Sequence, residues 1–132
     1  MIDVFIFEVS ETLYAIPKYD VIRVEDINEF EITSLPREKG DMFKVLQYMN
    51  KPLYLVNTSL LLKRNYAKDN FFIVLSFSKY FVGLGLRMIP DIFSVDEPEK
   101  RDGRKYVFIE GMEIQFLTKN DIMDTLKKLL DF

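Results

Sequence analysis

Carboxylates are the side chains of this sequence best suited to acid–base chemistry. The chain of 132 residues contains no Cys and no His, which excludes thiolate nucleophiles, imidazole bases and almost every zinc or iron site. Two carboxylate pairs remain, Asp3 with Glu8 and Glu97 with Glu99, but nothing in their spacing places either pair across a cleft. We therefore expect no catalytic residue, no metal and no cofactor.

A second acidic group, between residues 25 and 31, is a candidate site for a metal or a basic partner. Glu25, Asp26, Glu29 and Glu31 surround only two apolar residues. Exposed charge of this kind is common on protein surfaces. The sequence therefore favours a solvated connection here over a binding site.

Two glycines, Gly83 and Gly85, have the spacing found in phosphate-binding loops. Such a loop joins a strand to a helix, whereas these glycines stand inside an apolar, strand-like segment. Glycine within a strand more often marks a bulge or the close approach of another group. We expect a structural role for both.

The sequence has one basic cluster, formed by Lys100, Arg101, Arg104 and Lys105. These residues surround Asp102-Gly103 and could hold an anion or a partner protein. A charged, solvated loop from Glu97 to Lys105 is the favoured interpretation.

The overall charge argues against polyanions as partners. With 18 basic and 21 acidic residues the formal net charge is −3, which provides no footprint for nucleic acid or anionic lipid. No export signal is recognisable at Met1, and no apolar stretch reaches the roughly 18 residues needed to span a membrane. We expect a cytoplasmic protein without direct membrane insertion.

Short apolar runs separated by turn residues dominate the chain and predict a mainly β protein. Val, Ile, Leu, Phe and Tyr suit a pleated, buried surface, and the runs are too short for helices. The expected strands are Asp3–Val9, Leu13–Ile16, Val21–Val24, two within Phe43–Leu62 that meet at Met49-Asn50-Lys51, Phe71–Phe77, Tyr80–Leu86, Ile89–Val95 at a sheet edge, Tyr106–Ile109 and Ile114–Leu117. This pattern excludes a parallel doubly wound sheet and favours small antiparallel barrels or a sandwich.

One domain, residues 1–132, is the expected organisation. The linker-like segment Lys63–Asn70 divides the strands into groups at about 1–62 and 71–117. Between these groups, Asn57-Thr58-Ser59 can cap a single helical turn at Leu60–Leu62. Near the end of the chain, Gly111-Met112 predicts a type II′ hairpin turn with glycine at the first central position.

A helix is expected at Lys119–Leu130, where Thr118 and Asp121 can cap its first turn. Apolar residues recur at helical spacing and predict a buried stripe. The stripe consists of Ile122, Met123, Leu126, Leu129 and Leu130. Upstream, Ile32–Pro36 is expected to run extended into its proline, followed by a polar loop at residues 37–42.

Several of these segments, in this order, resemble the CheW-like domain of bacterial chemotaxis. The resemblance rests on Leu13–Pro17 with Val21–Val24, on Ile32–Pro36, on Phe43–Leu62, on Val82–Leu86, and on Phe116-Leu117 leading into the terminal helix. It implies two small five-stranded β-barrel subdomains that share a hydrophobic core, with a C-terminal α-helix. It also implies a non-catalytic adaptor that links the cytoplasmic tips of chemoreceptors to the regulatory domain of the histidine kinase CheA.

The sequence departs from that resemblance where the family's signature run, Gly-Val-Ile-Asn-Leu-Arg-Gly, falls on residues 44–50. Both glycines and the arginine are lost, and Met49 cannot supply the planar, charged donors of arginine. Asn50 can still take the left-handed conformation of the terminal glycine. The proline and aspartate usual in the next strand are Tyr54 and Asn57 here.

Charge changes sign at Arg23 and at Arg87, where the family commonly has acidic residues. Such changes alter the choice of partner more than the fold, so we expect a divergent adaptor with a rewritten docking surface. The partner-binding residues that this predicts are Arg23, Lys44, Gln47, Met49, Asn50 and Arg87. The alternatives are an interaction module of another signalling assembly and, with less support, a nucleic-acid-binding barrel, for which a basic groove is lacking.

Overall fold

The computed structural model describes residues 1–34 and 43–130, which form two sheets of six strands with a helix near the C-terminus. The expected extension through Leu35 and Pro36 and the polar loop at 37–42 lie outside the described residues. So do the side chains of Leu129 and Leu130. Within the described part of the chain, no helix is both long and apolar enough to cross a membrane.

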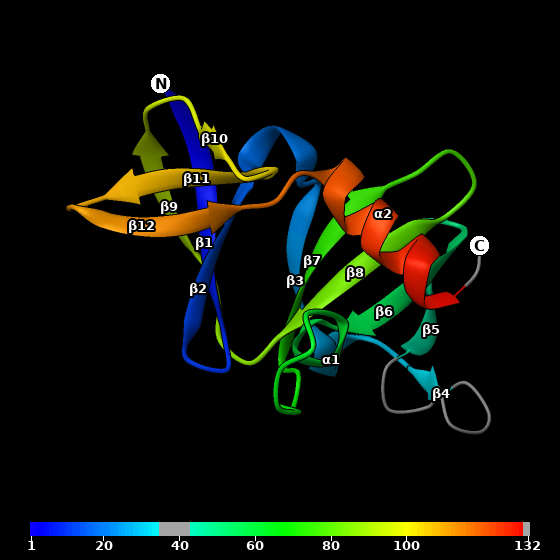
Figure 1. The fold of residues 1–132 in the computed structure, drawn as a ribbon. Coiled ribbons are helices and arrows are strands. Elements are labelled where there is room, and N and C mark those ends of the chain that lie inside the picture. Colours follow the sequence, from blue (N-terminus) through cyan, green and yellow to red (C-terminus); the bar gives the residue numbers. More distant parts are fainter. Residues whose placement is uncertain (35–42, 131–132) are drawn as a thin grey trace.

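The first sheet, sheet A, gathers strands from both ends of the chain (Figure 1). Its spatial order is β10 (Glu99–Arg101), β11 (Arg104–Ile109), β12 (Met112–Phe116), β2 (Thr12–Pro17), β1 (Ile2–Val9) and β9 (Asp91–Val95). Neighbouring strands are antiparallel except β12 and β2, which run parallel. As expected, the segment that contains Pro90 leads into an edge strand, β9.

The second sheet, sheet B, is built from the middle of the chain. Its spatial order is β3 (Arg23–Asp26), β7 (Phe71–Ser76), β8 (Phe81–Leu86), β6 (Lys51–Asn57), β5 (Phe43–Tyr48) and β4 (Thr33–Ser34). The division between the sheets therefore does not fall at residues 63–70. Strands β1 and β2 belong to the same sheet as β9 to β12. The strand groups expected at about 1–62 and 71–117 therefore do not correspond to the sheets.

Three clusters of buried side chains explain how the sheets hold together. One fills sheet A and includes Val4, Ile6 and Val107. Another fills sheet B and includes Leu46, Leu53 and Phe72. The third lies between the sheets and under the terminal helix, and it contains Phe5, Phe7, Ile16, Ile73, Leu84, Ile122 and Leu126.

Strand β1 serves two of these clusters, because its alternate side chains point to opposite faces. Val4 and Ile6 enter the interior of sheet A, while Phe5, Phe7 and Val9 enter the shared core. The prediction of a mainly β fold with two subdomains on a common core and a terminal helix is confirmed. Each sheet has six strands, where five were expected, when the short β4 and β10 are counted.

Both helices begin at the caps expected from the sequence. Helix α1 (Thr58–Leu61) is a single turn that starts two residues before the expected Leu60–Leu62, because Asn57 is its cap: Asn57 Oδ1 accepts a hydrogen bond from the Leu60 amide at 3.1 Å. Helix α2 (Lys119–Leu130) starts with a reciprocal cap between Thr118 and Asp121. Ile122 and Leu126 of its apolar stripe are buried.

Three local expectations were wrong. The segment from Glu97 to Lys105 is a hairpin of β10 and β11, not a loop, because Asp102-Gly103 forms a turn with φ of 53° and 78°. The β11–β12 turn is centred on Glu110 and Gly111, both at positive φ, as in a type I′ turn. Strand β3 starts at Arg23 and not at Val21.

Candidate partner-binding surface

The corner between β5 and β6 is a tight turn in which two residues adopt the left-handed conformation. Tyr48 pairs with Lys51, so Met49 and Asn50 are the central residues, with φ of 47° and 65°. Both positive angles match a type I′ turn, whose twist suits the flanking strands. Asn50 fits this turn as expected, whereas methionine seldom adopts such an angle.

Met49 occupies this unfavourable conformation with its side chain 65% exposed. Gln47 on β5 and Tyr54 on β6 share a face of the sheet, because Gln47 pairs with Pro52 and Tyr54 with Val45. Gln47 is exposed and Tyr54 is 38% exposed. We call Gln47, Met49, Asn50, Lys51 and Tyr54 the corner surface.

An aromatic chain connects the corner surface to the terminal helix. The ring of Tyr54 packs edge-on against Tyr80 with centroids 5.7 Å apart, and Tyr80 stacks on Phe77 at 5.5 Å. The Tyr80 hydroxyl in turn lies 3.9 Å from the Met123 sulfur on α2. Methionine and tyrosine are enriched where proteins meet proteins, since both combine apolar area with adaptable contacts. The corner surface therefore has the chemistry of a protein-binding patch.

Beside the corner, the interior of sheet B is closed by a hydrogen bond from β5 to β3. The Tyr48 hydroxyl donates to Glu25 Oε2 at 2.6 Å. Strands β3 and β5 are separated in the sheet by β7, β8 and β6, so sheet B must curl to bring them together. Burial, and then the bond and charge of Glu25, raise the pKa of Tyr48 to about 12.

Two cations lie near the residues that make this hydrogen bond or pack beside it. The positive charge of Arg23 acts on Tyr48 and favours its ionised form, although burial and Glu25 outweigh it. Lys51 Nζ lies 5.6 Å from the centre of the Phe81 ring. Arg23, an exposed residue at the start of the edge strand β3, thus lies within electrostatic reach of the Tyr48 hydroxyl.

Lys44 lies away from the corner surface. It stands five residues before Met49, which follows the end of β5, and at about 3.4 Å per residue this is roughly 17 Å. Its side chain also lies on the face opposite Gln47 and Tyr54, because Lys44 pairs with Leu55 and Val45 pairs with Tyr54. It borders a pocket of about 290 Å³ together with Asn57, Tyr66 and Asp69. Burial raises the pKa of Asp69 to about 6, against the opposing effects of the Asn57 hydrogen bond and the Lys44 charge.

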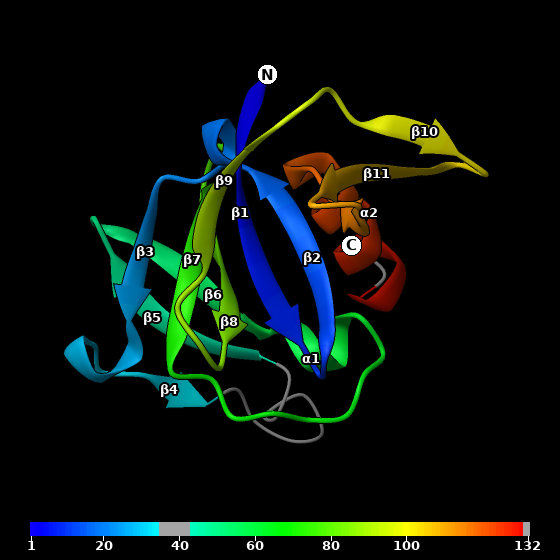
Figure 2. The same ribbon diagram turned by 90° about the vertical axis from the view of Figure 1, so that its left-hand side faces the viewer.

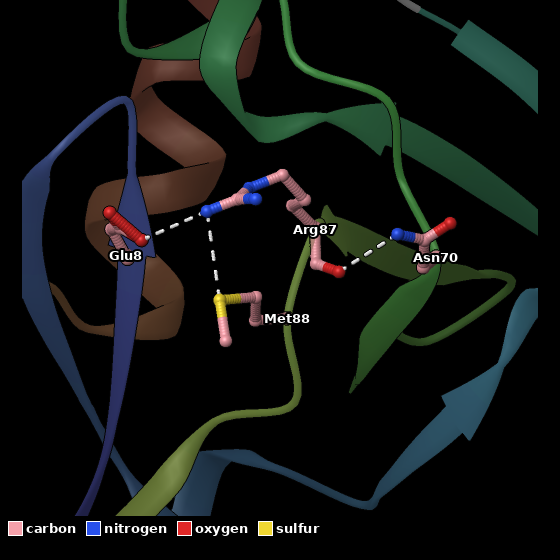
Figure 3. Close-up of polar contacts among 4 residues, drawn as sticks. All are labelled: Glu8, Asn70, Arg87 and Met88. Atoms are coloured by element: carbon pink, nitrogen blue, oxygen red, sulfur yellow. Dashed lines mark hydrogen bonds and ion pairs between the residues drawn. The ribbon is translucent and has the colours of Figure 1, made fainter.

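Arg87 follows β8 and joins the two sheets (Figure 3). Its guanidinium lies 3.5 Å from Glu8 Oε2 on β1. Its carbonyl oxygen accepts a hydrogen bond of 3.0 Å from the Asn70 side chain, and a further contact of 3.6 Å reaches the Met88 sulfur. The side chain is more than half exposed, so the ion pair itself contributes little to stability.

The structure therefore divides the six residues predicted to bind partners. Gln47, Met49 and Asn50 form one surface, whereas Lys44 and Arg87 stand apart from it. Arg23 is linked only to Tyr48, through its charge. Sequence reasoning left out Lys51 and Tyr54. Tyr54 could have been found from the alternation of β6. It stands two residues after Pro52, which pairs with Gln47, so Tyr54 and Gln47 lie on the same face of the sheet.

Two β subdomains on a shared core, followed by a C-terminal helix, define a CheW-like fold. A crystal structure of the scaffolding protein TtCheW from Thermoanaerobacter tengcongensis matches this chain with a TM-score of 0.71 and 17% sequence identity. The match covers 87% of this chain and 82% of that chain. No protein-family model matches the sequence, and neither does any curated protein. The likeness is one of fold.

Proposed function

We propose that this protein is a non-catalytic cytoplasmic adaptor of bacterial chemotaxis. It would bind the regulatory domain of a CheA histidine kinase and the cytoplasmic tips of chemoreceptors through protein–protein contacts alone. The observation that carries the proposal is the match of fold to a scaffolding protein over 87% of the chain. The order of the sequence segments that resemble the CheW-like domain supports it independently.

The corner surface is the part of the molecule that we assign to a partner. Met49 projects from a strained turn into solvent, and strain of this kind persists where the surrounding structure enforces it. An exposed methionine offers a partner apolar, adaptable area, while arginine at this position would offer paired donors. Met49 thus favours a partner whose contact is apolar.

We assign Lys44 and Arg87 a smaller contribution to partner binding than the corner surface. Each already has neighbours within the chain, Asp69 for Lys44 and Glu8 for Arg87. Partners that contact either residue would do so away from the corner surface. We therefore expect substitutions at these two positions to change binding less than substitutions at Met49.

Isothermal titration against the CheA regulatory domain from the same organism tests the proposal, with a receptor-tip fragment as the second ligand. Binding to either one at micromolar concentrations supports the adaptor function. If neither ligand gives heat or co-elutes with the protein, the coupling role is refuted and an interaction module of another signalling assembly takes its place. The fold would stand in either case.

Met49→Arg tests the assigned surface, and Met112→Arg is its matched control. Met112 is 55% exposed and begins β12 in sheet A, whereas the corner belongs to sheet B. We expect Met49→Arg to change partner affinity by about threefold or more, the scale of one altered polar contact, while the free energy of unfolding changes little. The control should alter neither quantity. Equal effects of the two substitutions on binding would remove the corner surface from the proposal.

A further inference from the structure

A pocket opens at the end of sheet B that lies opposite the corner surface. Strand β5 starts at this end with Phe43 and reaches the corner only after Tyr48. The segment 63–70, which joins α1 to β7, borders the pocket, and Figure 2 shows this segment, in green, passing across the lower end of the sheet. The pocket has a volume of about 290 Å³. The mouth of a curled sheet is a common place for a small ligand.

One wall of this pocket is apolar. Leu55 on β6 belongs to the buried cluster within sheet B, and Ile27 and Ile32 pack against that cluster while they remain partly exposed. Together these aliphatic side chains can cover an aliphatic group. Pockets for drug-sized ligands usually measure about 300–1,000 Å³. A pocket just below that range suits a molecule the size of a single amino acid.

Charges of both signs border the same space. Lys44 lies on the interior face of β5, because it alternates with Leu46 and Tyr48, which are buried within sheet B. Lys68 and Asp69 line the pocket from the segment 63–70. Among the described residues, neither lysine has its ammonium nitrogen within 4.0 Å of the Asp69 carboxylate. Both signs of charge are therefore available to a ligand.

The Asp69 carboxylate is held in place by neighbours that do not neutralise it. Asn57, which is 3% exposed, donates a hydrogen bond of 3.1 Å to Asp69 Oδ2. Gly85 lies directly against the carboxylate, where a Cβ atom would collide with both oxygens. Burial raises the pKa of Asp69 to about 6, and carboxylates perturbed in this way are concentrated at functional sites. A cationic group of a ligand would compensate the cost of this charge.

We propose that this pocket binds a small aliphatic α-amino acid as a free zwitterion. The ammonium group of the ligand pairs with Asp69, and its carboxylate pairs with Lys44 and Lys68. Its aliphatic side chain packs on the apolar wall. The site lies at the other end of sheet B from the corner surface, and it does not depend on the proposed adaptor function.

The arrangement of charges disfavours simpler ligands. A carboxylate without an ammonium group would bring a second negative charge toward Asp69. An amine without a carboxylate would leave both lysines unpaired and would be repelled by them. A metal ion is disfavoured because no three acidic side chains of the described residues lie close enough together to hold one. A zwitterion alone satisfies both signs of charge.

Isothermal titration with L-leucine and L-valine tests the choice of ligand. Isocaproate, which is leucine without its ammonium group, and isoamylamine, which is leucine without its carboxylate, are the matched probes. We expect at least one of the two amino acids to bind with a Kd between about 10 µM and 1 mM, and each probe to bind at least about tenfold more weakly. No heat from either amino acid up to about 10 mM would overturn the proposal. Binding of either probe as tight as that of L-leucine would also overturn it.

Three variants test whether the amino acid binds in this pocket. Asp69→Asn and Lys44→Met each remove one charged partner and should weaken binding about tenfold. Lys127→Met, at an exposed position of α2, is the control and should leave binding unchanged. Asp69→Asn should also raise the melting temperature of the ligand-free protein, because it removes a buried charge, so its loss of binding cannot come from unfolding. Unchanged binding by both pocket variants, or equal weakening by the control, would overturn the proposal.

Side-chain amides report directly where the ligand lies. The Asn57 amide donates to Asp69, so its signals in proton–nitrogen correlation spectra should shift when L-leucine is added. The Asn50 amide at the corner should not shift. Shifts at Asn50 without shifts at Asn57 would place the ligand elsewhere and overturn the proposal.

Discussion

Asp69→Asn should stabilise the protein at neutral pH. Asp69 precedes β7 and lies over Gly85, where it accepts a hydrogen bond of 3.1 Å from the Asn57 side chain. Its pKa is raised from 3.8 to about 6, first of all by burial. The amide oxygen of asparagine can accept the same hydrogen bond without carrying a buried charge.

The direction of the pH dependence follows from the raised pKa. Between about pH 4 and pH 6 the folded protein holds a proton on Asp69 that the unfolded chain has lost, so stability falls as the pH rises. A shift of about two pKa units corresponds to about 3 kcal/mol once both states are ionised. Because Asp69 keeps some exposure to water, we expect a gain of about 1–3 kcal/mol for Asp69→Asn at about pH 7.5.

Urea unfolding followed by far-ultraviolet circular dichroism measures this gain. At about pH 4.5 the folded carboxyl is already mostly protonated, and the advantage of the variant should shrink to about 1 kcal/mol or less. Asp124→Asn, an exposed carboxylate on α2, is the matched control and should show no such dependence. A variant that is less stable than the parent at about pH 7.5 would mean that attraction to Lys44 outweighs burial, and would refute the reasoning.

Two further substitutions test the interior of sheet B. Tyr48→Phe removes the hydroxyl that donates to Glu25 and should lower the free energy of unfolding by about 1–3 kcal/mol; urea unfolding checks this, and an unchanged value would mean that water replaces the phenol. Gly85→Ala would bring a methyl group into the Asp69 carboxylate and should cost about 1–3 kcal/mol by the same assay. A neutral result there would show that Asp69 can move aside.

The strands were predictable because their signal is local. Runs of β-branched and aromatic residues between turn residues indicate strands whatever their neighbours are. The pairing of the strands is not local, since β1 and β2 meet β9 and β12 from the other end of the chain. A linker-like segment such as residues 63–70 therefore says little about which sheet a strand joins.

The turns show where local rules reach their limit. Glycine at position 111 predicts a hairpin correctly, but its exact place in the turn depends on strand register. Register is set by which side chains enter the core, here Val107 opposite Ile114. The hairpin at Glu99–Lys105 was missed because its short strands are charged, and strands of this kind lack the apolar alternation that reveals others.

Of the candidate site, the sequence could place the residues of one turn together but not those of separate strands. Gln47, Met49 and Asn50 are neighbours in the chain and remain neighbours in space. The approach of β3 to β5 depends on the curl of sheet B, which the hydrogen bond between Tyr48 and Glu25 reveals. The separation of Lys44 from Met49, by contrast, follows from the extended geometry of β5 and could have been predicted.

Two departures from the CheW-like pattern have an explanation inside the molecule that requires no change of partner. Asn57 donates its amide to both Ala67 and Asp69, so an aspartate at this position would lose both bonds and face a second carboxylate. Arg87, where the resemblance leads one to expect an acid, lies against Glu8, and an acidic residue there would repel it. Internal compensation accounts for these two positions. The case for a rewritten docking surface therefore rests on Met49, for whose side chain no such compensation exists among the described contacts.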